Sequence, residues 1–236
     1  MRPLIICREP FASEVVNVTM RRAFFVVSLL AASAVTADVV HPVAASVPRG
    51  HVRRVIVDIP AGEITVRNGA ADRIRVSGEV QRESDDESEK AQRIVNNINV
   101  EIFVDDEDAL IRRKFGPEAS SWRATTWHTN YRLIVEVPRG VAINIETKYG
   151  EVTLEGEFGN IDADLRAGEI HLRTPRASVH ELNASVRVGE VHTDFGEDRE
   201  DHEGVLPGTT HFINANGHSR INVHTTFGEL HVTLTR

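Results

Sequence analysis

Gly168-Glu169-Ile170-His171-Leu172 is the stretch that decides the fold, because its pattern of Gly, Glu, apolar, variable and apolar residues recurs along the chain. Glycine permits a backbone corner that a Cβ atom would penalise. The two apolar residues point to one side of the following strand, and the residue between them points to the other. Each copy therefore predicts a corner followed by a strand with two buried side chains. The other copies are Gly62-Glu63-Ile64-Thr65-Val66, Gly150-Glu151-Val152-Thr153-Leu154, Gly189-Glu190-Val191-His192-Thr193 and Gly228-Glu229-Leu230-His231-Val232.

The spacing of the copies predicts how the strands stack. The last four begin at residues 150, 168, 189 and 228, which are 18, 21 and 39 residues apart, and 39 is close to two periods. A period of about 20 residues is typical of solenoids. We therefore predict an all-β fold, a β-solenoid or right-handed β-helix-like stack of short strands about 4.8 Å apart. We expect Ile170 to lie over Val152, and Val191 over Ile170.

The region before these copies has a looser pattern. Val55, Val57 and Ile59 alternate with other residues, and turn residues interrupt the run, as in an all-β domain. The first copy begins at Gly62, 88 residues before Gly150. We predict one β-repeat domain over residues 53–236, with a looser β region over 53–147 and regular repeats over 148–236.

One short helix is expected inside the looser region. Ser84 and Glu87 have the spacing of a capping box, in which each side chain accepts a hydrogen bond from a backbone N–H at the helix start. Apolar residues then recur at helical spacing from Ala91 to Ile98. These features predict about three helical turns between two β segments.

The N-terminal residues have the features of a secretory signal peptide. Met20-Arg21-Arg22 is basic, residues 23–34 are uncharged and largely apolar, and Val35-Thr36-Ala37 offers small residues at a cleavage point. The apolar run is shorter than the about 20 residues of a membrane span. We predict an N-terminal extension with signal peptide over residues 1–37, translation starting at Met20, and a flexible tether over 38–52. An uncleaved anchor is the alternative.

Export agrees with the cysteine content. Cys7 is the single cysteine and lies in the leading segment, so the mature chain has no disulfide and no thiol nucleophile. We expect a periplasmic, outer-surface or extracellular protein without an integral membrane span.

Charge and motifs exclude several function classes. The formal net charge is −8 and basic residues form no extended cluster, so we expect no nucleic-acid partner. The chain has neither a Gly-x-Ser-x-Gly elbow nor a phosphate-binding glycine loop. We predict no enzyme activity, no catalytic residues and no cofactor.

Two sets of residues are candidate ligand sites. Trp122 and Trp127 lie in one loop and could form a platform for carbohydrate stacking, or cover an edge of the core. Stacking of the repeats places His171 and His192 in one outward column with Thr153, and His231 further along. Histidines about 4.8 Å apart could share a transition metal. We favour a row of solvated imidazoles, because the Gly-Glu carboxylates are expected in a separate row at the corners.

Three segments resemble one protein family. The first two match its pattern of Val-Pro-x-Gly followed by Thr-x-x-Gly-x-Val-x-Leu, and the third, with the later Gly-Glu units, resembles its repeats. This resemblance to the bacterial DUF4097 adhesin-like family covers Arg53 to the C-terminus. It implies an elongated stack of strands that is exported or membrane-tethered, and it supplies no catalytic residues. This chain departs from the family in having Glu after the Gly and in its Trp-containing loop. The segments are Val135-Glu136-Val137-Pro138-Arg139-Gly140-Val141, Ile145-Glu146-Thr147-Lys148-Tyr149-Gly150-Glu151-Val152 and Thr226-Phe227-Gly228-Glu229-Leu230.

These features together predict an exported, non-enzymatic β-repeat protein. Its partner would be a surface or cell-envelope ligand, either a glycan or a protein. A small β-helix carbohydrate-active enzyme is one alternative, and a self-assembling structural scaffold is the other.

Overall fold

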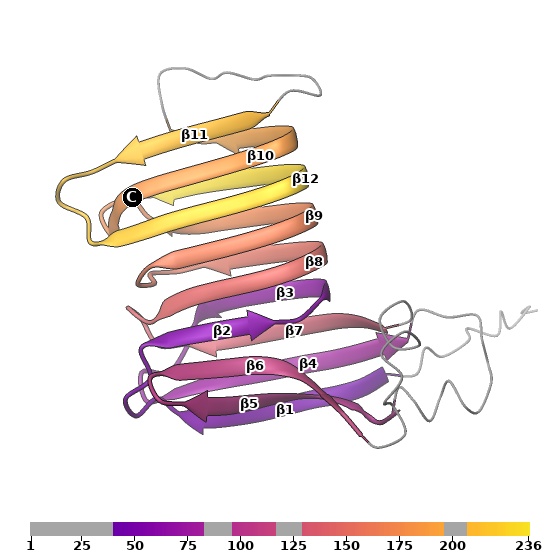
Figure 1. The fold of residues 1–236 in the computed structure, drawn as a ribbon. Coiled ribbons are helices and arrows are strands. Elements are labelled where there is room, and N and C mark those ends of the chain that lie inside the picture. The colour runs from indigo at the N-terminus through magenta and orange to yellow at the C-terminus, as the bar shows by residue number, and fades with distance from the viewer. Residues whose placement is uncertain (1–39, 83–95, 117–128, 196–206) are drawn as a thin grey trace, which may run out of the picture. The chain divides into compact units, whose positions relative to one another are not determined.

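Residues 40–82, 96–116, 129–195 and 207–236 are described by the computed structural model, and they belong to one unit that spans Ala37–Arg236. They form twelve strands of one mixed sheet, which confirms the all-β class (Figure 1). No helix among these residues is long and apolar enough to cross a membrane. The strands are β1 (Val40–Pro48), β2 (Arg54–Asp58), β3 (Ala61–Asn68), β4 (Arg73–Arg82), β5 (Ile98–Asp105), β6 (Asp108–Phe115), β7 (Thr129–Val137), β8 (Ala142–Glu155), β9 (Ile161–Pro175), β10 (Val179–Thr193), β11 (Gly208–Ile213) and β12 (Ser219–Thr235).

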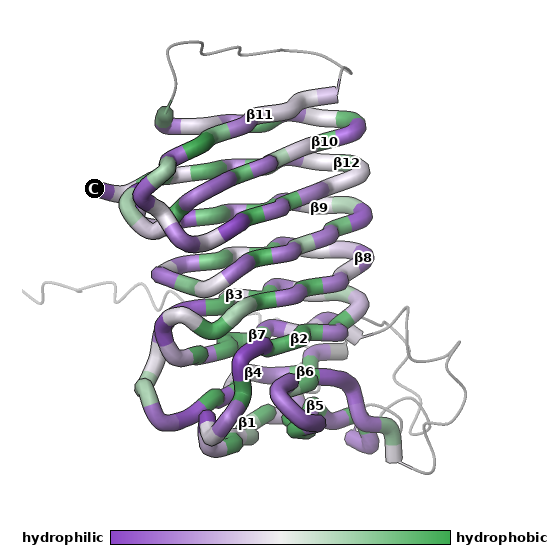
Figure 2. Tube along the Cα trace, turned by 60° about the vertical axis from the view of Figure 1, so that its left-hand side comes forward, coloured by the Kyte–Doolittle hydropathy of each residue, from purple (hydrophilic) through white to green (hydrophobic). Residues whose placement is uncertain are grey.

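The sheet folds over on itself because its long strands bend at glycine. In β9, buried side chains alternate up to Leu165, and the alternation resumes one position out of phase at Ile170. Gly168 lies between them with a φ of 136°. The change of phase turns the apolar side chains of both arms of the strand toward one interior, where they join one core cluster. Figure 2 shows the alternation of hydrophilic and hydrophobic residues along each arm.

Parallel pairing at the centre stacks the bent strands in the order β8, β9, β12 and β10. Val152 pairs with Ile170, as the sequence predicts. The prediction that Val191 lies over Ile170 is wrong, because Leu230 of β12 pairs with both of these residues. The chain leaves β10, forms β11 antiparallel to the first arm of β10, and returns as β12 between β9 and β10.

The copy at Gly62 belongs to the same stack. Gly62 pairs with Gly150, and β3 follows the second arm of β8 in register. β2 follows the first arm of β8, so β2 and β3 together repeat the course of one bent strand. Two backbone N–H groups, of Lys148 and Tyr149, donate to the carbonyl of Pro60 at the break between β2 and β3. The predicted division between a looser region and regular repeats at residue 147 is therefore wrong.

Antiparallel strands cover both ends of the parallel stack. β1, β4 and β7 pair antiparallel in that order, β5 pairs with β6, and β11 pairs with β10. β1 corrects the prediction of a flexible tether over residues 38–52, since Val43 on this strand is buried. Pro42 and Pro48 are compatible with β1 because it is an edge strand, where a missing N–H breaks no internal ladder.

The predicted helix falls largely outside the described residues, because residues 83–95 are not among them. Ile98, which the helical pattern placed in the last turn, begins strand β5 instead and is fully buried. An apolar residue can mark either a helix face or a strand face, and the pairing of Ile98 with Phe115 of β6 selects the strand.

The buried hydroxyl group of Tyr131 is expected to limit the stability of the protein at alkaline pH. Burial raises the pKa of its hydroxyl, against smaller lowering contributions from Thr129 and Arg113. The folded state therefore holds this proton more tightly than the unfolded state. The stabilisation is complete below about pH 10 and is lost as pH rises through the folded-state pKa. When urea unfolding is measured at increasing pH, the free energy of unfolding should fall less above about pH 10 for Tyr131→Phe than for the unsubstituted protein. The matched control is Tyr149→Phe on the exposed Tyr149, which should follow the unsubstituted protein; identical profiles for the two variants would contradict the assignment.

Candidate functional site

Three histidines form one row on the outward face of the stack. His171 of β9 pairs with His231 of β12, and His231 pairs with His192 of β10. Ring centroids are 4.7 Å apart in both pairs, and the interplanar angles are 6° and 15°. The predicted column is therefore present, but His231 lies at its centre and not further along. Thr153 continues the row on β8, as predicted.

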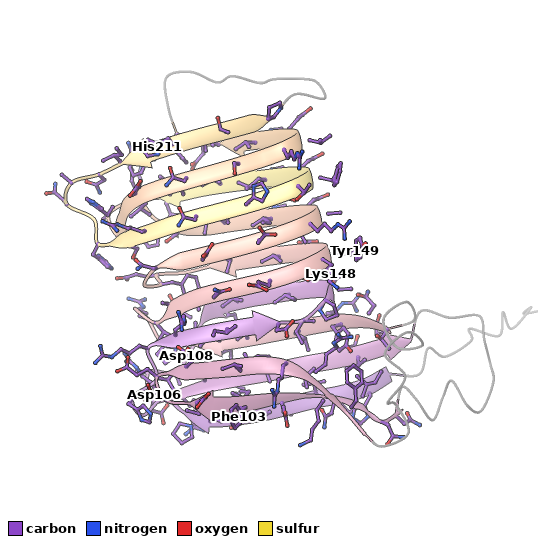
Figure 3. The ribbon with its side chains drawn as sticks, in the orientation of Figure 1. Phe103, Asp106, Asp108, Lys148, Tyr149 and His211 are labelled. Carbon is purple, nitrogen blue, oxygen red and sulfur yellow. The ribbon has the colours of Figure 1, made fainter. Side chains whose placement is uncertain are left out.

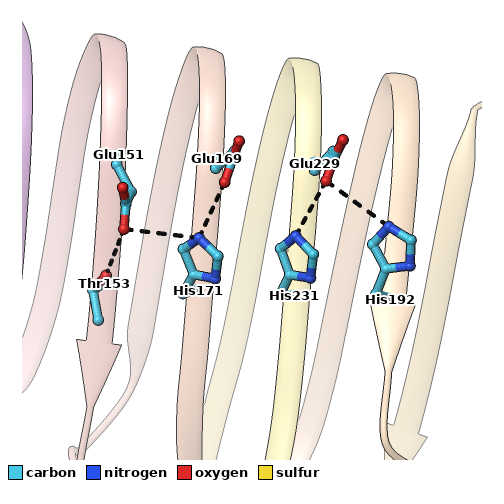
Figure 4. A network of polar contacts seen from close by, with 7 residues as sticks. All are labelled: Glu151, Thr153, Glu169, His171, His192, Glu229 and His231. Atoms are coloured by element: carbon cyan, nitrogen blue, oxygen red, sulfur yellow. Dashed lines mark hydrogen bonds and ion pairs between the residues drawn. The ribbon is translucent and has the colours of Figure 1, made fainter.

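A row of glutamates runs beside the histidines. Each glutamate precedes its histidine by two residues, so both side chains leave the same face of the strand. The Nε2 atom of His171 lies 3.3 Å from an Oε2 atom of Glu169, and His231 has the same separation from Glu229 (Figure 4). His192 lies 3.3 Å from Glu190.

The sequence predicts these carboxylates in a separate row at the corners, but each of them lies 3.3 Å from the imidazole of its own copy. We call Glu151, Thr153, Glu169, His171, Glu229, His231, Glu190 and His192 the His/Glu ladder.

Carboxylates also bridge neighbouring strands of the His/Glu ladder. An Oε1 atom of Glu151 on β8 lies 3.8 Å from Nε2 of His171, and an Oε2 atom of Glu229 lies 4.0 Å from Nε2 of His192. The three imidazoles are 36–39 % exposed. Solvent and ligands can therefore reach these side chains, and imidazole nitrogens can form hydrogen bonds and bind metals.

Two exposed aromatic residues lie beside the ladder at the bend. Tyr149 and Phe227 each precede the corner glycine of their copy, and they are 48 % and 50 % exposed. Both pair with Ala167, so one strand with a small side chain separates them. Figure 3 shows Tyr149 and Lys148 at this edge. Sequence reasoning missed the pair, although the position before each corner glycine was a usable signal.

The predicted tryptophan platform cannot be placed, because Trp122 and Trp127 lie outside the described residues.

A second outward feature is a charged depression on the first arms of the strands. Asp58, Glu146 and Asp164 pair across β2, β8 and β9. The depression that they line also contains Lys148 and Arg166. Sequence reasoning missed these carboxylates as well. Each lies four residues before a corner glycine, so the repeat extends further back than its five-residue core.

Comparisons with known proteins give structural neighbours only. No family model matches the chain, and no curated protein matches it. A solved structure described as a putative cell adhesion protein from Clostridium sporogenes has 11 % identity and a TM-score of 0.43, over 83 % of this chain and 100 % of that one.

Two further neighbours are described as putative adhesins. That from Parabacteroides merdae has 7 % identity and a TM-score of 0.27, over 64 % of this chain and 67 % of its own. The structure from Parabacteroides distasonis has 9 % identity and a TM-score of 0.24, over 81 % of this chain and 96 % of its own. The names agree with the adhesin-like character implied by the sequence resemblance, and at these identities and TM-scores they carry no argument about function.

Proposed function

We propose that the protein is an exported, non-enzymatic β-repeat protein that attaches to a ligand of a surface or cell envelope. On this proposal its stacked, bent strands form a short solenoid of the kind implied by the sequence resemblance. The observation that carries the proposal is the set of exposed rows along the bend, in which carboxylate and imidazole side chains repeat at the strand spacing and two aromatic side chains lie two strands apart.

The chemistry of these rows suits a chain-like polar ligand such as a polysaccharide. Aromatic faces supply apolar contact area, and a small number of polar groups fix the orientation of a ligand. Tyr149 and Phe227 are two strands apart, which is about 9.6 Å at the usual spacing. The neighbouring carboxylates and imidazoles can accept or donate hydrogen bonds to hydroxyl groups. A row that crosses β8, β9, β12 and β10 can contact several successive units of a polymer.

The proposal predicts that Tyr149 and Phe227 carry ligand contact. The full chain should bind polysaccharides on a glycan array without cleaving them, and the double variant Tyr149→Ala, Phe227→Ala should bind at least about 10-fold more weakly, since aromatic contacts are each worth about 1 kcal/mol or more. Phe103→Ala is the matched control, because Phe103 is 46 % exposed on β5, away from the bend. Release of shortened glycans, or equal binding by both variants, would count against the proposal.

A carbohydrate-active enzyme remains the second candidate, and the charged depression favours it. Asp58, Glu146 and Asp164 lie on adjacent strands. The usual strand spacing of about 4.8 Å is close to the separation of about 5–5.5 Å between the two carboxyl groups of retaining glycosidases. Any hydrolysis of a glycan by the full chain should then disappear in Glu146→Gln while binding through the bend persists.

A further inference from the structure

We propose that the His/Glu ladder binds one divalent transition metal ion of the class that prefers imidazole, represented by Zn²⁺ or Cu²⁺. Two overlapping groups of ligands are present. One consists of Glu169, His171 and His231, and the other of His192, Glu229 and His231. Two imidazole nitrogens and one carboxylate oxygen are a common protein ligand set for such ions. The proposal does not depend on adhesion, because its readout is metal binding itself.

The spacing of the ligand atoms is close to that of a bound ion. In each group these atoms all lie within 4.8 Å of one another. In tetrahedral coordination, ligand atoms at about 2.0–2.2 Å from Zn²⁺ lie about 3.4 Å from one another. Changes in side-chain torsion angles that move each ligand atom by about 1 Å or less would close the difference. The imidazoles can make this adjustment because they are 36–39 % exposed.

The strands hold the ladder ready for an ion. Backbone pairing fixes His171, His231 and His192 on adjacent strands, and Figure 4 shows their Nε2 atoms turned toward the carboxylates. Glu151 and Glu190 add carboxylates beyond the two groups, and they offset the charge of a divalent ion. Ca²⁺ and Mg²⁺ favour sets of oxygen ligands, so the mixed nitrogen and oxygen set should discriminate against them.

The central position of His231 gives the site a distinctive response to mutation. Because both groups need His231, we expect one ion per chain. His231→Ala leaves His171 and His192 two strands apart, so neither group survives. His171→Ala and His192→Ala each leave one group intact.

Isothermal titration of the full chain with Zn²⁺ tests this response. Removal of a mere hydrogen-bonding partner of a metal ligand costs about 10–100-fold in affinity, so His231→Ala should cost at least about 100-fold. His171→Ala and His192→Ala should each cost about twofold, because one of two similar groups remains. The exposed His218, in the turn before β12, supplies the control His218→Ala, which should bind like the unsubstituted protein. An affinity for Zn²⁺ that is the same in His231→Ala and His218→Ala would overturn the proposal.

A gain of binding provides the second test. Thr153 occupies the row next to His171, and its hydroxyl lies 3.3 Å from a carboxylate oxygen of Glu151. In Thr153→His the row would contain four imidazoles, which would form two separate pairs of metal ligands. The variant should therefore bind two Zn²⁺ ions where the unsubstituted protein binds one. The Cu²⁺ form of the unsubstituted protein should show electron paramagnetic resonance couplings to two imidazole nitrogens. An unchanged stoichiometry in Thr153→His, or couplings that persist in His231→Ala, would overturn the ladder as the site.

Discussion

Gly168→Ala should lower the free energy of unfolding by at least about 3 kcal/mol, a large part of the about 5–15 kcal/mol that stabilises a typical domain. Gly168 has a φ of 136°, a backbone conformation that side chains with a Cβ rarely adopt and that costs about 1–3 kcal/mol in strain. A Cβ atom there would also lie 1.8 Å from the carbonyl oxygen of Gly150 on the neighbouring strand. Since that oxygen belongs to the backbone of the stack, relief would require two strands to separate.

Gly140→Ala separates the two contributions to this cost. Gly140 also has a positive φ, of 73°, but a Cβ atom there would have no neighbour within 4 Å. Only backbone strain applies, so the loss should be about 1 kcal/mol. Urea unfolding followed by circular dichroism measures both variants. Equal losses in Gly168→Ala and Gly140→Ala would show that the close approach of the strands is not what requires glycine at the corner.

The corner glycines also explain what the sequence could predict about the fold. The pairing of Val152 with Ile170 follows from two adjacent copies joined by a short connection. The place of β12 could not be predicted, because β8, β9, β10 and β12 all carry the same Gly-Glu corner followed by an apolar residue. The local pattern is therefore compatible with more than one order of these strands. In the structure β11 occupies one side of the first arm of β10 and β12 occupies the other, which separates β10 from β9.

For the candidate site, the sequence predicts the row of histidines but not which histidine lies at its centre. The histidine row follows from the repeat itself, because equivalent positions of paired strands lie side by side. The contact between Glu169 and His171 was also implied, since residues two apart share a face of a strand. The central place of His231 depended on the position of β12. The position of β12 between β9 and β10, which the local sequence pattern does not specify, therefore decides which histidines are neighbours.

Leu230→Ala should cost about 2–5 kcal/mol of stability, the usual loss when a buried leucine is truncated and the cavity stays open. Leu230 is fully buried on β12 and pairs with Ile170 on one side and Val191 on the other. With strands on both sides, its surroundings have little freedom to collapse into the space. If the strands stacked in sequence order, Leu230 would instead lie in the outermost copy and its truncation would cost less.

Two valine substitutions test the strand order with the same chemical change. Val232 of β12 is 2 % exposed, between strands β9 and β10. Val191 of β10 is only partly buried, and among the described residues its arm pairs with β12 alone. Val232→Ala should therefore cost about 2–3 kcal/mol, for two buried methyl groups and the cavity they leave, and Val191→Ala about 1 kcal/mol or less. Stacking in sequence order predicts the reverse, because Val191 would then be the interior residue and Val232 the peripheral one. Urea unfolding of the two variants therefore decides whether β12 lies at the end of the stack or between β9 and β10.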